Sequence, residues 1–159
     1  MKIPEKNVIK KGDVLKIYTD GASRGNPGPS AWAFIFVKGE EIIYSESEYL
    51  GKATNNVAEY TAVIKALEKA VEYTRWNVEI YSDSELIINQ LNRKWRIKKD
   101  HLKDLHKKVV SEKANFNEVN FVYIPREFKF IKEADRFCND CLNKHVGGTR
   151  DETNRTFTP

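Results

Sequence analysis

The chain has 159 residues, of which 40% are hydrophobic and 31% are charged, a composition typical of one soluble globular domain with a single core. Its 27 Lys and Arg residues exceed its 23 Asp and Glu residues and give a net charge of +4, which permits a polyanionic partner without requiring one. No apolar run is long enough to cross a membrane, and the N-terminus lacks the apolar core of a signal peptide, so we expect a cytoplasmic monomer with no membrane partner.

Three strands are expected near the start of the chain, after a polar, lysine-rich segment (residues 1–12) that is predicted to be a loose arm. The first strand is expected to end at Asp20. The following residues, 21–30, contain three glycines and two prolines, which favours a loop. The predicted strands cover residues 14–19, 31–37 and 41–49. Their short connections favour an antiparallel meander.

The remaining elements alternate between helices and strands. Apolar residues recur at helical spacing over residues 56–74, where Thr54 or Asn55 is a natural N-cap. The later elements are expected as a strand at 77–82, helices at 84–92 and 100–114, a strand at 118–124 and a helix at 131–145. Residues 13–145 therefore form the predicted domain, and residues 146–159 form a polar C-terminal tail.

This order predicts an α/β fold with a five-stranded mixed sheet flanked by helices. The first three strands form its antiparallel part, and right-handed crossovers place the fourth and fifth strands parallel to the first. The carboxyl ends of the parallel strands then share one edge of the sheet, where open α/β sheets usually carry their sites. Four acids are expected at this edge: Asp20, Glu59, Asp83 and Asp135.

Each of these acids also has an ordinary interpretation. Asp20 can belong to a turn, Asp83 can cap the following helix, and Glu59 and Asp135 can be acids favoured by a helix dipole. Gathered at one point, however, several carboxylates must bind cations or stay partly protonated. Oxygen ligands suit Mg²⁺ or Mn²⁺, and two such ions can clamp the attacking water and the leaving oxygen in phosphoryl transfer. If the four acids meet, the pattern therefore fits a site for such cations.

Four phrases of the sequence resemble the type 1 ribonuclease H family in their order and spacing. They are Thr-Asp-Gly with Asn-Pro-Gly at 19–28, Thr-Asn-Asn-x-Ala-Glu at 54–59, Ser-Asp-Ser at 82–84 and Glu-Ala-Asp-Arg at 133–136. The resemblance runs from about Lys16 to Cys141 and implies the ribonuclease H-like fold. It further implies an endoribonuclease that cleaves the RNA strand of RNA–DNA hybrids and leaves 5′-phosphate and 3′-hydroxyl ends. Such an enzyme uses two Mg²⁺ ions, for which Mn²⁺ can substitute. By motif match, the resemblance implies that Asp20, Glu59, Asp83 and Asp135 are its catalytic metal ligands.

The resemblance also implies substrate contacts. Asparagine side chains are expected in the minor groove of the hybrid, because an amide can both donate to and accept from the 2′-hydroxyl that distinguishes RNA from DNA. Thr54 is expected to contact a phosphate of the DNA strand. For Asn55 and Asn56 an ordinary interpretation stays open, namely that they only cap the following helix. The candidate contacts are Asn26, Thr54, Asn55, Asn56, Ser84 and Trp95.

The basic segment 93–99 has two interpretations. Its Lys and Arg residues flank Trp95, which suits phosphate contacts beside an aromatic platform. It is shorter than the basic protrusion of some relatives. Alternatively, it is a solvated linker whose tryptophan packs into the core.

The chain departs from the family in the loop before the last helix, where many relatives carry a histidine. Here the loop resembles the Pro-Arg-Glu form of one subgroup, and Arg126 and Glu127 are candidate auxiliary residues. No N-terminal hybrid-binding domain is recognised, so a stand-alone enzyme is expected. A catalytically silent nucleic-acid-binding module, or a nuclease that also cleaves double-stranded RNA, stays open as an alternative.

The two cysteines, Cys138 and Cys141, have a C-x-x-C spacing that can indicate redox chemistry or zinc. They fall inside a predicted helix, where His145 is the only nearby third ligand and a fourth is lacking. We therefore expect ordinary, partly buried helix residues.

Overall fold

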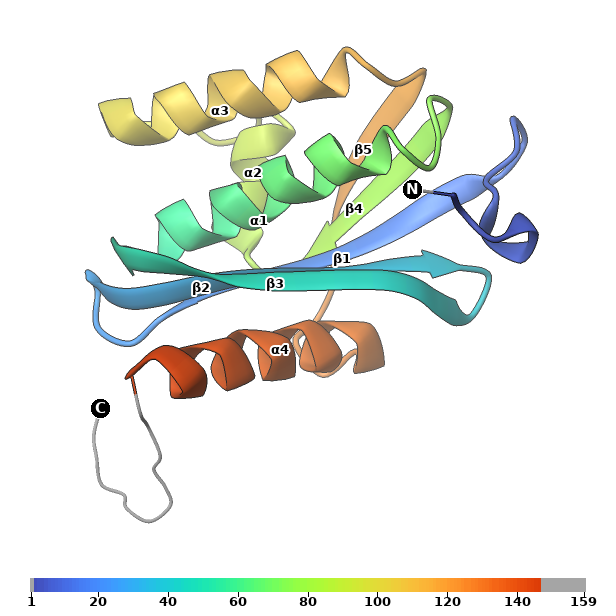
Figure 1. The fold of residues 1–159 in the computed structure, drawn as a ribbon. Helices are drawn as coiled ribbons and strands as arrows, with labels where there is room; N and C mark the ends of the chain where they lie inside the picture. The colour runs from blue at the N-terminus through green and yellow to red at the C-terminus, as the bar shows by residue number, and fades with distance from the viewer. Residues whose placement is uncertain (1, 147–159) are drawn as a thin grey trace.

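The computed structural model describes residues 2–146, which fold into a five-stranded sheet flanked by helices (Figure 1). The elements in chain order are a 3₁₀ helix η1 (Glu5–Asn7), β1 (Val14–Ser23), β2 (Gly28–Lys38), β3 (Glu41–Ala53), α1 (Asn55–Ala70), β4 (Asn77–Ser82), α2 (Glu85–Leu91), α3 (Asp100–Lys113), β5 (Glu118–Tyr123) and α4 (Lys129–Val146).

The strands lie in the order β3-β2-β1-β4-β5. The β1–β2 and β2–β3 pairs are antiparallel, whereas β4 runs parallel to both β1 and β5. This confirms the predicted mixed sheet, in which an antiparallel meander is joined to two parallel strands. Helices α1, α2 and α3 lie on one face of the sheet, and α4 covers the opposite face (Figure 1).

Strand β2 contributes to two hydrophobic cores, one on each face of the sheet. Its residues Trp32, Phe34 and Phe36 point into the core under α1–α3, whereas Ala33 and Ile35 point into the core under α4. Successive strand residues point to opposite faces, so a strand covered on both sides must be apolar at nearly every position. This explains the continuous apolar run that the sequence places in this strand.

Small residues bring α1 close to the sheet. Ala58, Ala62, Ala66 and Ala70 recur every four residues and are fully buried, as the helical spacing of the sequence predicts. Because each side chain is only a methyl group, the helix backbone can approach the strands closely. The first turns of α1 are thereby brought against β1.

The glycine- and proline-rich stretch 21–30 is mostly strand, which differs from the loop predicted for it. Pairing between β1 and β2 continues as far as Ser23 opposite Ser30, which leaves a connection of only residues 24–27. Asp20 therefore lies inside β1, opposite Ala33, and not at the end of the strand. Backbone pairing on both sides of β2 outweighs the turn preference of these residues.

The N-terminal segment is attached to the domain, although its composition predicts a loose arm. Ile9 is buried in the core under α1–α3. The Lys38 ammonium donates hydrogen bonds to the carbonyl oxygens of Lys6 and Val8, at 3.0 and 2.9 Å. One buried isoleucine and one lysine therefore hold the segment on the end of the sheet.

The helices agree with the predicted ones to within a few residues. The largest difference is α1, which ends at Ala70 and is followed by a hydrogen-bonded turn in which the Tyr73 N–H donates to the Ala70 carbonyl. The last helix extends to Val146, and the rest of the predicted polar tail, residues 147–159, lies outside the described residues. Over residues 2–146, none of the helices combines the length and the apolar character that crossing a bilayer requires.

Candidate active site

Three of the four predicted acids meet at one end of the sheet. Carboxylate oxygens of Asp20, Glu59 and Asp83 all lie within 4.8 Å of one another. Asp20 belongs to β1, Glu59 to the second turn of α1, and Asp83 follows β4 directly. Since β1 and β4 are parallel and pair Tyr18 with Tyr81, the aspartates two residues further along, Asp20 and Asp83, lie side by side.

Gly21 permits the close approach of α1 to β1 at this point. A Cβ atom on Gly21 would lie 2.6 Å from the carbonyl oxygen of Ala58 and would overlap the main-chain carbon. The Gly21 N–H donates a hydrogen bond of 3.1 Å to Oε1 of Glu59. The glycine of the Thr-Asp-Gly phrase therefore both makes room for the helix and orients the glutamate.

Burial and mutual repulsion favour the protonated form of these acids. Asp20 is only 6% exposed, and burial, followed by the charges of Asp135 and Asp83, raises its pKa to about 8. Burial is also the main cause that raises the pKa of Glu59, with the charges of Asp20 and Asp83 next. The pKa of Asp83 is raised by burial, against the opposing charge of Arg126. The fold thus gathers negative charge that it does not itself neutralise.

Asp135 approaches the same place from the other face of the sheet. It lies on α4, is exposed, and is outside the group of oxygens within 4.8 Å. Its charge nevertheless contributes to the raised pKa values of both Asp20 and Asp83. The four predicted acids therefore interact electrostatically, with three in a compact group and the fourth at its exposed side.

The donor atoms of this group fit a hard divalent cation. All of them are carboxylate oxygens, the ligands that Mg²⁺ and Mn²⁺ prefer. Among the described residues, Oδ2 of Asp20 is the buried side-chain oxygen that lacks a hydrogen-bond partner. Such an atom is costly unless something else satisfies it. A cation coordinated there would supply the missing partner and remove the repulsion between the acids.

Both candidate auxiliary residues lie beside this group. Nε of Arg126 is 3.7 Å from Oδ2 of Asp83, and its side chain is 81% exposed. Its charge lowers the pKa of Asp83 and of Glu59, whereas the charge of Glu127 raises that of Asp83. The loop after β5 therefore places one positive and one negative side chain at the edge of the acidic group.

Asn26, Thr54 and Asn55 lie together at the start of α1. The Asn55 N–H donates a 2.9 Å hydrogen bond to Oδ1 of Asn26, and the Val57 N–H donates to Oγ1 of Thr54 at 3.2 Å. Thr54 is therefore the N-cap of α1. The Asn26 side-chain oxygen is occupied within the protein, so its amide NH₂ is the group left to face a ligand.

Ser84 has a clear structural role as the N-cap of α2. Its Oγ accepts a 3.2 Å hydrogen bond from the Ile87 N–H. Because Ser84, and not Asp83, caps α2, the Asp83 carboxylate can belong to the acidic group.

Trp95 is 46% exposed on the connection between α2 and α3, so the interpretation that it packs into the core is wrong. The connection turns sharply, with Arg93 at φ 60° and the N–H groups of Lys94 and Trp95 donating to the Asn89 carbonyl. The ring is therefore available at the surface.

Cys138 is a site neighbour that the sequence did not indicate. It is fully buried, and its Sγ lies 3.5 Å from the carbonyl oxygen of Asp20 and 3.8 Å from that of Ala31. Burial raises its pKa, with the negative charge of Asp20 next, so the thiol stays protonated. Its side chain therefore packs against the backbone of β1 and β2 at Asp20, and its helical spacing from Ala134 and Leu142 was the available signal.

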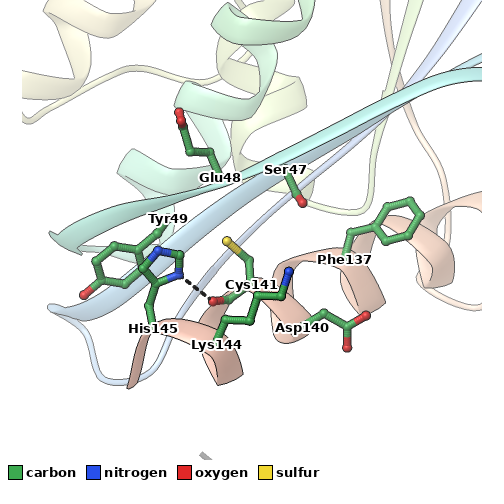
Figure 2. A pocket seen from close by; sticks show the side chains of 8 residues that line it. All are labelled: Ser47, Glu48, Tyr49, Phe137, Asp140, Cys141, Lys144 and His145. Carbon is green, nitrogen blue, oxygen red and sulfur yellow. Dashed lines mark hydrogen bonds between the residues drawn. The ribbon is translucent and has the colours of Figure 1, made fainter. Parts of the chain in front are cut away.

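A separate pocket of about 460 Å³ lies between β3 and α4 (Figure 2). The His145 ring stacks on Tyr49 at 4.5 Å between centroids, and its Nδ1 lies 3.0 Å from the Cys141 carbonyl oxygen. Glu48 points away from Cys141 and Lys144, toward the other face of the sheet. None of the predicted site residues lines this pocket.

Comparisons of sequence agree on one family. The profile of a family described as "Reverse transcriptase-like" matches residues 18–141. A Ribonuclease HI of Halobacterium salinarum is 34% identical over 134 residues, which make up 84% of this chain and 66% of that protein. A Ribonuclease H of Clostridium botulinum is 32% identical over 146 residues, which make up 87% of this chain and 96% of that protein.

Solved structures give the same result. The crystal structure of RNase H1 from Halobacterium salinarum NRC-1 has a TM-score of 0.78 at 33% identity and covers 82% of this chain and 98% of its own. LC11-RNase H1, in complex with an RNA/DNA hybrid, has a TM-score of 0.77 at 36% identity. The match covers 83% of this chain and 99% of the LC11-RNase H1 chain.

Some relatives are much longer. The chain spans 35% of the length of the Bifunctional protein Rv2228c of Mycobacterium tuberculosis, to which it is 33% identical over 129 residues. The Clostridium relative, by contrast, is matched over nearly its full length, and the profile match contains all four acids. The chain therefore belongs to the type 1 ribonuclease H family.

Proposed function

We propose that this protein is a metal-dependent endoribonuclease that hydrolyses the RNA strand of RNA–DNA hybrids and leaves 5′-phosphate and 3′-hydroxyl ends. The observation that supports this most directly is the meeting of Asp20, Glu59 and Asp83 within 4.8 Å. Membership of the ribonuclease H family supports the reaction class, and the hybrid bound by LC11-RNase H1 supports the choice of substrate.

The proposed cofactor is a pair of Mg²⁺ ions, with Mn²⁺ as a substitute. Asp20, Glu59 and Asp83 would hold them together with Asp135, and the buried Asp20 would supply the oxygen that lacks a partner within the protein. Divalent ions bound there supply the charge that activates a water and stabilises a leaving oxyanion. The protein contributes a rigid set of oxygens whose repulsion favours cation binding.

Arg126 keeps the acids ready to bind cations. Its positive charge opposes the increase in the pKa of Asp83 and of Glu59, so a larger share of each is ionised at neutral pH. It occupies part of the loop where many relatives carry a histidine, and Glu127 beside it is the proposed proton acceptor at the exposed side of the group.

The proposed substrate surface lies along the start of α1 and the β1–β2 connection. Asn26 offers an amide NH₂, and Asn55 and Asn56 lie at the first positions of α1. These groups suit the 2′-hydroxyls and base edges of a minor groove. Trp95 is proposed as a stacking or packing surface for the backbone of the hybrid.

The test is a cleavage assay on end-labelled duplexes of one sequence: RNA–DNA hybrid, double-stranded RNA and double-stranded DNA. Each is incubated with Mg²⁺, Mn²⁺ or a chelator, and with the wild-type protein or Asp83→Asn. We expect the hybrid to be cut by the wild-type protein only, and only with metal. A folded wild-type protein that leaves the hybrid intact under both metals would show the proposal to be wrong.

The same assay separates the alternatives. Tight binding of the hybrid without cleavage would identify a catalytically silent binding module. Cleavage of double-stranded RNA at a comparable rate would widen the substrate to both A-form duplexes. A cytoplasmic location and a monomeric state stay predictions, which fractionation and gel filtration can test.

A further inference from the structure

Arg24 joins the β1–β2 connection to α4. Its Nη2 donates a 2.6 Å hydrogen bond to Oδ1 of Asn143 and a weaker one, at 3.4 Å, to the carbonyl oxygen of Asn139. Oδ1 of Asn139 lies at 3.5 Å from the same nitrogen. The two asparagines are one helical turn apart, so a single guanidinium nitrogen of Arg24 contacts two successive turns of α4.

The same short connection is also fixed to α1. The Arg24 N–H donates a 2.8 Å bond to the Pro29 carbonyl and closes the turn. Oδ1 of Asn26 accepts the Asn55 N–H at the start of α1. The connection therefore lies between two helices on opposite faces of the sheet, attached to α1 through Asn26 and to α4 through Arg24.

The partners of Arg24 lie on the same stripe of α4 as Asp135. Asp135, Asn139 and Asn143 are spaced by four residues and so share one face of the helix. The Asn139 amide donates to the Asp135 carbonyl oxygen at 3.0 Å, which places this side chain along the stripe. The contact of Arg24 thus fixes the distance between a proposed substrate contact, Asn26, and the helix that carries a proposed metal ligand.

We propose that Arg24 is a positioning residue that seats the Asn26 connection on α4, so that the minor-groove contact and the acidic group lie in a fixed relation. The expected effect of Arg24 on cleavage rests on the proposed function, whereas the hydrogen bonds between Arg24 and α4 do not. A lysine ammonium can also donate to these oxygens, but it lacks the planar fork that fixes the direction of the arginine N–H groups, so we expect it to hold the helix less firmly. The contact is intramolecular, so its loss loosens the connection without removing a ligand of the acidic group.

The first test is steady-state cleavage of the hybrid by Arg24→Ala, Asn143→Ala and the double variant. Losing one such hydrogen bond costs about 1 kcal/mol, or roughly fivefold in KM, while kcat stays within about twofold. The double variant should resemble Arg24→Ala, because both changes remove the same contact. Arg24→Lys should recover part of the loss. Arg75→Ala is the matched control, since that exposed arginine precedes β4 at the opposite end of the sheet.

Two outcomes would overturn the proposal. An increase in KM for Arg24→Ala with none for Asn143→Ala would mean that the arginine touches the substrate itself. No change in either variant would mean that the contact has no role.

The second test does not depend on activity. Amide hydrogen exchange of Asn55, whose N–H donates to Oδ1 of Asn26, should be roughly tenfold faster in both single variants and unchanged in Arg75→Ala. Equal exchange in all four proteins would refute the seating of the connection. If the wild-type protein cuts no hybrid, the proposed function fails, and the exchange rates alone decide whether Arg24 holds the connection in place.

Discussion

Replacing Asp20 with Asn should stabilise the metal-free protein while abolishing its activity. Burial and the charges of Asp135 and Asp83 raise the pKa of Asp20 from 3.8 to about 8. Its folded-state pKa therefore lies above its unfolded-state pKa. The stability that the protonated carboxyl contributes is complete below about pH 4 and is lost as the pH rises through about 8. An amide at this position does not titrate and avoids that loss.

The size of the effect follows from the same difference. At about 1.4 kcal/mol per pH unit, the increase in the pKa of Asp20 from 3.8 to about 8 sets an upper limit of about 6 kcal/mol on the free energy of unfolding that its ionisation removes. Relaxation of the site and access of water reduce such penalties, so we expect a measured gain of about 2 kcal/mol above pH 8. For a protein of this size, that gain raises Tm by about 4–8 °C.

The measurement is urea unfolding of wild type and Asp20→Asn in chelator at about pH 5 and about pH 9, followed by the same titrations with Mn²⁺. The gain should be larger at the higher pH, and saturating Mn²⁺ should stabilise the wild type selectively. Glu85→Gln, at an exposed acid in the first turn of α2, is a control for general charge effects. Equal stability of wild type and Asp20→Asn at the higher pH would refute the claim that the acids repel one another.

Three further predictions concern other positions of the site. Gly21→Ala should lower the free energy of unfolding by about 3 kcal/mol or more, or prevent folding, because the new Cβ would overlap the backbone of Ala58. Calorimetry measures this change, and a decrease below about 1 kcal/mol would contradict the prediction. Arg126→Ala should raise the pKa of Asp83 and move the acid limb of the pH–activity profile to higher pH with Tm unchanged, whereas an unmoved limb would show that Arg126 does not act on the acids. Trp95→Ala should leave the free energy of unfolding within about 0.5 kcal/mol and increase KM for the hybrid; an unchanged KM would remove Trp95 from the substrate surface.

The convergence of the acids was predictable because it depends on chain order and handedness alone. Two short connections force an antiparallel meander of three strands, and the right-handed crossover makes β4 parallel to β1. Once those directions are fixed, residues toward the carboxyl ends of β1 and β4 must lie near the same edge of the sheet. The face on which α4 packs did not affect this conclusion: α4 covers the face opposite α1 (Figure 1), and the charge of Asp135 on α4 still acts on Asp20 and Asp83.

The ends of the strands could not be predicted from residue type. Glycine and proline at 21–30 favour a turn, but Gly28 and Pro29 pair with Ala53 and Lys52 of β3, which the local sequence does not reveal. The contact between Arg24 and α4 joins residues that are more than one hundred positions apart in the chain. Such pairs are determined by the packed structure, and a single sequence contains no local signal for them.

Two kinds of substitution are expected to change the stability of the protein in opposite directions. This difference separates the residues that maintain the fold from those that are present for function. Stability comes from apolar contacts on both faces of the sheet, including the alanine stripe of α1 and the buried Cys138 behind Asp20, and removing any of these should destabilise the protein. The acids do the reverse, since each one adds repulsion that the cores must offset. A fold maintained for its own stability would not hold an unpartnered carboxylate oxygen inside such a group. The acidic group is therefore best explained as a cation site that the surrounding packing keeps assembled.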